Sequence, residues 1–194
     1  MDVLFLAEQQ AGFIIPINMK TMMLKIKGLA FIVCLFSITA SAQYETTIKI
    51  QAMEMAKAIL AKDVEKAVQY LPPKLVEASG GKAKVLVVRD SLNKFMQQFG
   101  VEIKKITIGN PAKVISYKDQ LQTTLPQITQ VKFMQGIVVI ESTLIAISED
   151  KGKHWYFVDT NIYRSSKLKE ALPNLSPELV IPPMKKPEMI PDSQ

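Results

Sequence analysis

Residues 136–160 read G-I-V-V-I-E-S-T-L-I-A-I-S-E-D-K-G-K-H-W-Y-F-V-D-T, and this stretch decides the fold. Residues 136–148 are mostly apolar and rich in β-branched side chains, which is typical of a buried β-strand. Residues 149–152 have the composition of a turn, and residues 154–160 return with strand character. The stretch therefore predicts an antiparallel hairpin within a sheet.

The turn of this hairpin has the pattern S-x-D-x-G-x-x-W, formed by Ser148, Asp150, Gly152 and Trp155. The aspartate can accept backbone N–H groups across the turn, and the glycine can adopt a positive φ. The pattern resembles the Asp-box of sialidases and related repeat proteins, in which it is a structural turn away from the active site. Those proteins carry several copies and this chain has one, so we expect a fold-stabilising turn with Trp155 packed beneath it.

Upstream of the hairpin, the sequence predicts helices first and strands afterwards. Apolar residues recur every three or four positions over residues 46–71 and 82–99, which indicates amphipathic helices. Asp63 can begin a second helix within the first region, and Gly100 ends the later helix. We expect the sheet to bury both apolar stripes. The later stripe consists of Val85, Val88, Leu92, Phe95, Met96 and Phe99.

From Val101 the apolar period changes to two, and a change of phase at Lys104–Lys105 predicts a β-bulge. Residues 113–126 predict a strand region that Lys118–Asp119 can interrupt, while Pro126 predicts a strand end or a sheet edge. The fold class is therefore α+β, with N-terminal helices packed on a curved antiparallel sheet of about four strands.

The C-terminal segment, residues 166–194, forms a proline-rich tail. Six prolines between Pro173 and Pro191 exclude a helix or a central strand there. We expect the tail to dock on the domain through Leu179, Val180, Ile181 and Met184. A proline-rich ligand for a partner protein is the alternative.

The first 42 residues divide into two segments. Residues 19–42 combine a basic start, an apolar centre and the A-x-A sequence Ala40-Ser41-Ala42, which together predict a secretory signal peptide. The apolar centre is about ten residues long, whereas a membrane span needs about 20. We expect cleavage after Ala42 and export to the periplasm or the medium, with membrane contact only during export. Residues 1–18 indicate a start assigned too early or an unusually long n-region.

Composition excludes several classes of protein. The chain has one cysteine and one histidine, which excludes a disulfide framework and a Cys/His or multi-histidine metal site. We predict no metal and no cofactor. The net charge is +6, but residues 43–194 carry 19 scattered lysines and only two arginines. Because arginine is the residue that forks onto guanine and phosphate, we predict no nucleic-acid partner.

Glu141 is the candidate that carries most chemistry, because it lies in the most apolar strand. Burial there would raise its pKa and suit a general base or a ligand anchor. Tyr117, Tyr156 and Asp159 are its candidate companions from neighbouring strands in a ligand-binding site. Alternatively, Glu141 faces solvent or pairs with a lysine such as Lys113 or Lys132.

His154 is a weak candidate for catalysis. It is adjacent to Trp155 and so faces the other side of the strand, and no second histidine or G-x-S-x-G nucleophile motif accompanies it. We therefore predict no catalytic residue.

Three stretches resemble small exported bacterial proteins of the nuclear transport factor 2-like superfamily. They are M-A-K-A-I-L-A-K-D-V-E-K-A-V over residues 55–68, S-G-G-K over residues 79–82 and S-E-D-K-G-K-H-W-Y-F-V-D over residues 148–159. The resemblance covers about Gln43 to Thr160 and implies a cone of helices against a curved antiparallel sheet, in a domain of residues 43–165. Cystatin-like folds are the nearest alternative.

Superfamily members include isomerases, dehydratases and many non-catalytic binding domains. Their enzymes often place an aspartate–histidine or tyrosine–aspartate pair in the cone, and no such pair maps onto this chain. The resemblance therefore implies a non-catalytic domain that binds a small apolar ligand or a protein partner, and a homodimer through the sheet is compatible with it. A small lyase or isomerase that uses Glu141 or Asp159 as its base is the alternative.

Overall fold

The computed structural model describes residues 43–162, 170 and 172–191. All described residues belong to one compact unit. The predicted segments 1–18 and 19–42, with Ala40 and Ala42, lie outside the described residues. In the part of the chain that the structure describes, no helix has both the length and the apolar character needed to cross a membrane.

Four helices of the described part of the chain precede the sheet. The first is helical from residue 43 to residue 60. Asp63 then caps a new helix by accepting a 3.0 Å hydrogen bond from the backbone N of Lys66, so the predicted break at this aspartate is confirmed. The following helices are α2 (Val64–Val68), α3 (Pro73–Ala78) and α4 (Lys82–Gln98).

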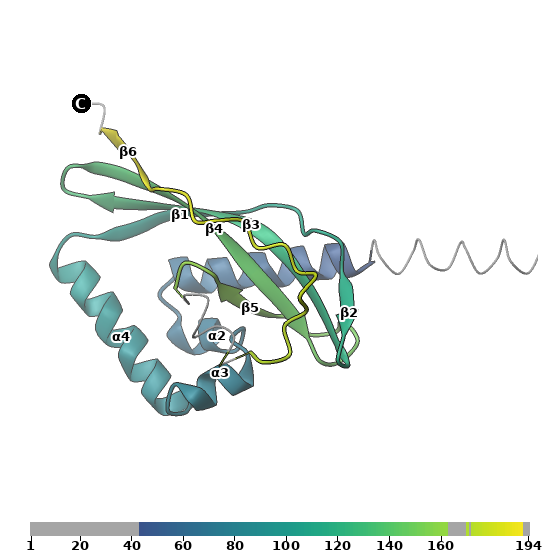
Figure 1. Ribbon diagram of the computed structural model, residues 1–194. Coiled ribbons are helices and arrows are strands. Elements are labelled where there is room, and N and C mark those ends of the chain that lie inside the picture. Colours follow the sequence, from purple (N-terminus) through teal and green to yellow (C-terminus); the bar gives the residue numbers. More distant parts are fainter. Residues whose placement is uncertain (1–42, 163–169, 171, 192–194) are drawn as a thin grey trace, which may run out of the picture. The chain divides into compact units, whose positions relative to one another are not determined.

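The sheet is antiparallel, which confirms the predicted α+β class. Its central order is β1-β3-β4-β5, with β2 paired to β3 and β6 paired to β4 (Figure 1). The expected number of about four strands was too low, because the sheet has six. The strands are β1 (Glu102–Ile108), β2 (Ile115–Tyr117), β3 (Gln120–Phe133), β4 (Gly136–Ser148), β5 (Tyr156–Asp159) and β6 (Glu188–Pro191).

Pro126 does not end a strand, because it lies in the middle of β3, but it is paired with a strand, β4, on one side only, as at a sheet edge. The neighbouring backbone shows why the missing N–H is tolerated. The N of Gly109 donates to the carbonyl of Pro126 and the N of Ala112 donates to the carbonyl of Thr124, at 2.8 Å each. Pro126 therefore faces the loop between β1 and β2, where no ladder bond is required of its nitrogen. A Cβ on Gly109 would lie 2.4 Å from Pro126 Cγ, so this close approach requires glycine.

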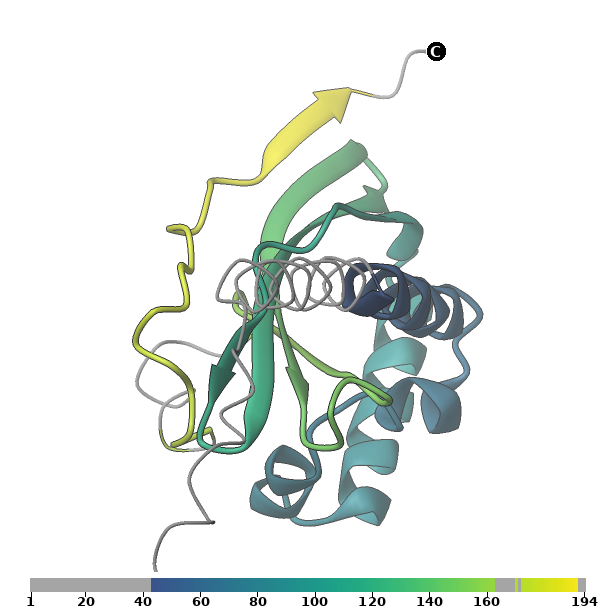
Figure 2. The ribbon, with the colours of Figure 1, turned by 90° about the vertical axis from the view of Figure 1, so that its right-hand side faces the viewer.

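The first helix lies against one face of the sheet (Figure 2), and its apolar stripe packs there. Ile48 and Ala52 are fully buried against Leu144 of β4 and against Trp155 and Phe157. This packing confirms that the sheet buries the first stripe. The opposite face is covered by α3 and the tail, through Leu75, Ile145, Ile147, Val158 and Leu172.

The tail is docked, but mostly by contacts other than those predicted. The fully buried side chain of Gln122 forms two hydrogen bonds with the backbone of the tail. Its Nε2 donates to the carbonyl of Asn174, and its Oε1 accepts from the N of Ser176. Leu179 packs on the core as expected. The other three predicted anchors, Val180, Ile181 and Met184, are exposed, because this last part of the tail is held through its backbone and through β6.

The stripe of α4 is the main departure from the expected core. Only Val85 is buried, packed on Val68 and Leu71 near the start of the helix. Further along, the exposed fractions are 54% for Leu92, 57% for Phe95 and 55% for Phe99. Because α4 packs on α2 and α3 rather than on the sheet, the expected burial of this stripe is wrong, and a cavity lies between α4 and the sheet.

Candidate functional site

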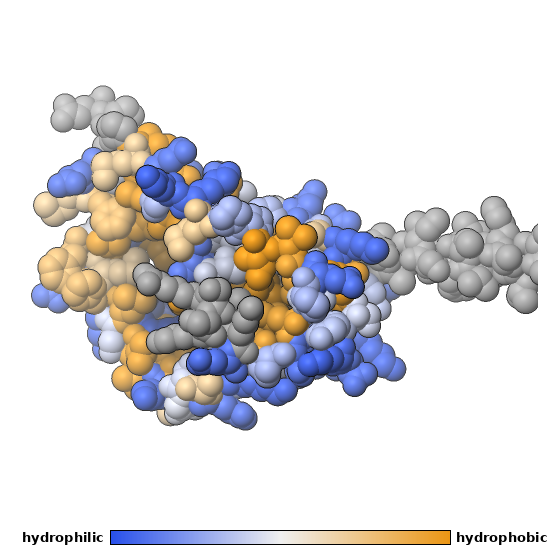
Figure 3. Space-filling view, viewed as in Figure 1, coloured by the Kyte–Doolittle hydropathy of each residue, from blue (hydrophilic) through white to orange (hydrophobic). Residues whose placement is uncertain are grey.

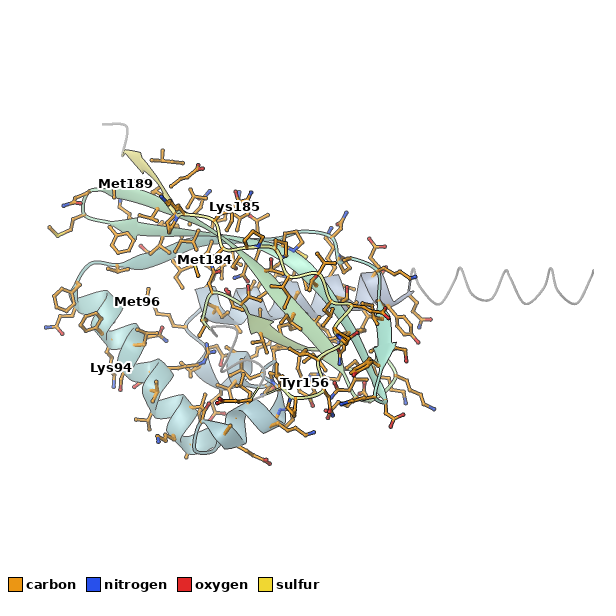
Figure 4. The ribbon with its side chains drawn as sticks, viewed as in Figure 1. Lys94, Met96, Tyr156, Met184, Lys185 and Met189 are labelled. Atoms are coloured by element: carbon orange, nitrogen blue, oxygen red, sulfur yellow. The ribbon has the colours of Figure 1, made fainter. Side chains whose placement is uncertain are left out.

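A cavity of about 320 Å³ lies between α4, the end of the first helix and the sheet. Its walls are mostly apolar, and Met96 reaches from α4 toward the sheet (Figure 4). This size and character match a site for a small organic ligand. The lining includes Ala58, Ile59, Val64 and Ala67 from the first helices, Leu92 and Met96 from α4, and Ile103, Ile106 and Ile140 from the sheet.

A β-bulge shapes one wall of the cavity. Ile103 and Ile106 are three residues apart, so in a regular strand they would face opposite sides of the sheet. The pairing of β1 with β3 shifts register between Ile103 and Lys105, as the sequence predicted. The extra residue lets both isoleucines line the cavity.

A polar cluster of Gln127, Ser142 and Asp159 interrupts the apolar lining. Gln127 Nε2 and Ser142 Oγ each donate to Asp159 Oδ2 at 3.0 Å, and Gln127 Nε2 also donates to Ser142 Oγ at 3.2 Å. The backbone N of Asn161 donates to Asp159 Oδ1 at 2.8 Å. Side chains from β3, β4 and β5 thus meet at one point of the cavity wall.

Two members of this cluster, Asp159 and Gln127, are not fully stabilised by their surroundings. Desolvation raises the pKa of Asp159 above its ordinary value, although the hydrogen bonds from Asn161, Ser142 and Gln127 oppose the shift. Gln127 is 7% exposed, and among the described residues its Oε1 is the buried side-chain oxygen left without a hydrogen-bond partner. Such orphan acceptors are rare in folded proteins and cost stability.

Glu141 does not lie in the cavity. Its neighbours Ile140 and Ser142 line the cavity, so alternation along β4 turns Glu141 to the opposite face. There its Oε2 accepts from Lys185 Nζ at 2.6 Å, and its side chain is 45% exposed. The alternative of an ion pair with a lysine is therefore what the structure contains, but the lysine comes from the tail, which is far away in sequence.

The structure does not bring the other predicted companions together. Tyr117 lies in β2, where the ammonium of Lys118 stands 5.5 Å from the centre of its ring. Tyr156 is three residues before Asp159 and so points to the other face of β5. Of the four predicted ligand-binding residues, Asp159 alone lines the cavity.

The predicted Asp-box residues form a closed turn. Asp150 Oδ1 accepts from the backbone N of Lys153 and His154, and Ser148 Oγ accepts from the N of Gly152 at 2.9 Å. Gly152 has φ +85°. Burial raises the pKa of Asp150, but the hydrogen bonds from His154, Ser148 and Lys153 outweigh it and leave the pKa below its ordinary value.

This turn is joined to the first helix rather than to the cavity. Trp155 is fully buried, and its Nε1 donates to the carbonyl of Gly152 at 3.0 Å. Gln51 bridges the helix and the turn: its Oε1 accepts from the N of Trp155, and its Nε2 donates to the carbonyl of Lys153, both at 2.8 Å. The arrangement is that of a structural support.

His154 stacks on Tyr70 with 5.9 Å between the ring centres, outside the cavity lining. Burial, followed by the hydrogen bond to Glu54 Oε2, raises the pKa of Tyr70 to about 12. This aromatic pair therefore packs the segment after α2 against the hairpin.

Sequence reasoning missed Gln127 and Ser142. Both stand on strand faces whose other members are largely apolar, since Gln127 alternates with Leu125 and Val131, and Ser142 alternates with Ile140 and Leu144. A polar residue within an apolar alternation was the available signal. Pairing of the two strands, which the sequence leaves open, was needed to place both beside Asp159.

Comparison of the chain with protein-family models, with curated proteins and with solved structures found no match. No three of the described His, Cys, Asp and Glu residues are grouped so that they could hold a metal ion.

Proposed function

We propose that this chain is a non-catalytic binding domain whose ligand is a small, mostly apolar molecule held between α4 and the sheet. The cavity of about 320 Å³ carries this proposal, because most of its exposed wall is apolar and it includes the polar cluster of Gln127, Ser142 and Asp159. Apolar pockets with a few fixed polar groups are the usual form of small-molecule sites. The nuclear transport factor 2-like resemblance of the sequence also implies a non-catalytic binding domain.

Filling the cavity tests the proposal. Ile140→Trp places a bulky ring in the lining, whereas Val139→Trp places the same ring on the opposite face of β4. We expect naphthalene, titrated while backbone amide NMR signals of cavity residues are followed, to bind saturably to the wild type and to Val139→Trp. Ile140→Trp should lose this binding. Shifts that grow linearly without saturation in all three proteins would refute the proposal.

The alternative is a small lyase or isomerase with Asp159 as its base. The raised pKa of this carboxyl favours it, because a base poised nearer to neutral pH suits proton transfer. Three other ionisable side chains line the cavity, namely the exposed Lys62 and Asp63 and the half-buried Arg89.

Proton exchange separates the two functions. Cyclohexanone in D₂O should incorporate deuterium beside its carbonyl at the same rate with the wild type and with Asp159→Asn if the domain only binds. Faster exchange with the wild type would favour the enzyme.

We further propose that the domain is exported after cleavage of the signal peptide. The three-part pattern of residues 19–42 supports this step. N-terminal sequencing of the protein from the producing cells should begin at Gln43. A chain that keeps residues 29–39 would contradict it.

A further inference from the structure

The hydrogen-bond capacity of the Gln127–Ser142–Asp159 cluster is unbalanced. Gln127 Nε2 has two hydrogens, which are used by Ser142 and Asp159. The hydroxyl of Ser142 is used by Asp159. Every side-chain donor of the cluster is therefore engaged. Gln127 Oε1 has no partner among the described residues, and Asp159, with three described donors for about four acceptor positions, has one position left. The group that completes this cluster is a hydrogen-bond donor.

The charges around the cavity argue that this donor is neutral. The carboxylate of Asp159 disfavours an anion beside it, so a fatty acid or a phosphate is a poor match. Lys62, Asp63 and Arg89 also belong to the lining, so that with Asp159 it has two basic and two acidic side chains and offers a cation no net attraction either. A hydroxyl group satisfies both conditions and can donate to an acceptor in the cluster.

The apolar part of the lining continues out of the cavity along α4. Leu92 lines the cavity, and Phe95 and Phe99 follow it on the same helix face at spacings of three and four residues. The rings of Phe95 and Phe99 contact each other at 4.6 Å between centres, and both are more than half exposed. Figure 3 shows apolar residues gathered over this side of the molecule. Seven residues of helix extend this stripe by about 10 Å.

We infer that the ligand is an elongated apolar alcohol, whose hydroxyl lies at the Gln127–Ser142–Asp159 cluster and whose chain leaves the cavity along Leu92, Phe95 and Phe99. This inference rests on the proposed binding function and adds the chemical class of the ligand. It also gives the exposed stripe of α4 a role that burial in the core does not supply.

The polar end is tested by competition against naphthalene. 1-Decanol should displace naphthalene at a concentration at least about tenfold lower than 1-methoxydecane, which has a similar chain but no donor. In Gln127→Met the two compounds should become equal. The matched control is Gln130→Met, which makes the same change on the opposite face of β3 and should keep the difference.

The apolar end is tested by chain length. Each methylene of 1-decanol beyond 1-hexanol should improve displacement by about two- to fourfold, as burial of a methylene predicts. Phe95→Ser should reduce this increment without changing the displacement by 1-hexanol. Val87→Ser removes another exposed apolar side chain of α4 that lies off the stripe, and it should leave the increment intact.

Several outcomes overturn the inference. Equal displacement by 1-decanol and 1-methoxydecane, or tighter binding of decanoate, refutes the hydroxyl, and this comparison on the wild type decides even if Gln127→Met fails to fold. An unchanged increment in Phe95→Ser, with dissociation of an oligomer in sedimentation equilibrium, makes the stripe a protein interface instead. If naphthalene itself does not bind the wild type, it is the proposed function that fails.

Discussion

The first helix and α4 carry the same kind of apolar stripe, but the stripe is buried in the first helix and largely exposed in α4. Ile48 and Ala52 of the first helix are fully buried against the sheet, whereas Leu92, Phe95 and Phe99 of α4 are more than half exposed. The two stripes differ because the two helices have different partners. Gln51 holds the first helix to the turn that precedes Trp155, whereas α4 packs on α2 and α3 rather than on the sheet. A periodic stripe therefore specifies a helix with an apolar face, but it does not specify what packs against that face.

The strongest way to break the packed region is Trp155→Ala. The indole is fully buried, and its removal leaves a large hole between the first helix and the hairpin. We expect the free energy of unfolding to fall by about 3–5 kcal/mol. Urea denaturation followed by circular dichroism measures this change. Wild-type stability would mean that the first helix does not depend on the turn.

Gly152→Ala should weaken the same region by less. The glycine has φ +85°, and a Cβ there would lie 2.5 Å from Tyr44 Cε1. Backbone strain and displacement of the tyrosine ring together should cost about 1–3 kcal/mol. The equivalent change at Gly81, which also has positive φ but where a Cβ meets open space, isolates the backbone part. If both variants lose the same stability in urea melts, contact with Tyr44 adds nothing.

The desolvation of Asp159 in the cavity region should make the stability of the protein depend on pH. Because the pKa of Asp159 is raised above 3.8 in the folded state, its contribution to stability is complete below that pH and is lost as the pH rises through the folded value. The stability of the wild type relative to Asp159→Asn should therefore decrease from about pH 4 to pH 7. Urea melts of both proteins across this range give the difference. A relative stability that rises with pH would contradict the desolvation of Asp159.

The smallest effect is expected on the exposed stripe. Phe95→Ser combined with Phe99→Ser should change the free energy of unfolding by no more than about 1 kcal/mol, since exposed side chains contribute little to folding. The paired change Ile48→Ser and Ala52→Ser in the first helix should unfold the domain under the same conditions. A large loss from the α4 pair would show that its stripe is buried in solution and would remove the contrast between the two helices.

Sequence alone determined the local elements, because their signals lie within a few residues. Asp63 caps α2, the bulge lies where the apolar phase changes, and Ser148, Asp150 and Gly152 close the turn beneath which Trp155 packs. Each of these features depends on backbone conformation and on hydrogen bonds between residues close in sequence. The α+β order of helices and then strands followed from the same local periodicities.

Only the tertiary structure decided which faces meet and where the site lies. Strand pairing places Gln127 and Ser142 beside Asp159, although they come from three different strands. The face of β4 that holds Glu141 was open to either side until the tail brought Lys185 to it. The stripe of α4 looked like core because periodicity reports one helix at a time, whereas burial depends on what packs against it. The cavity is the space left between elements, and no single stretch of sequence encodes it.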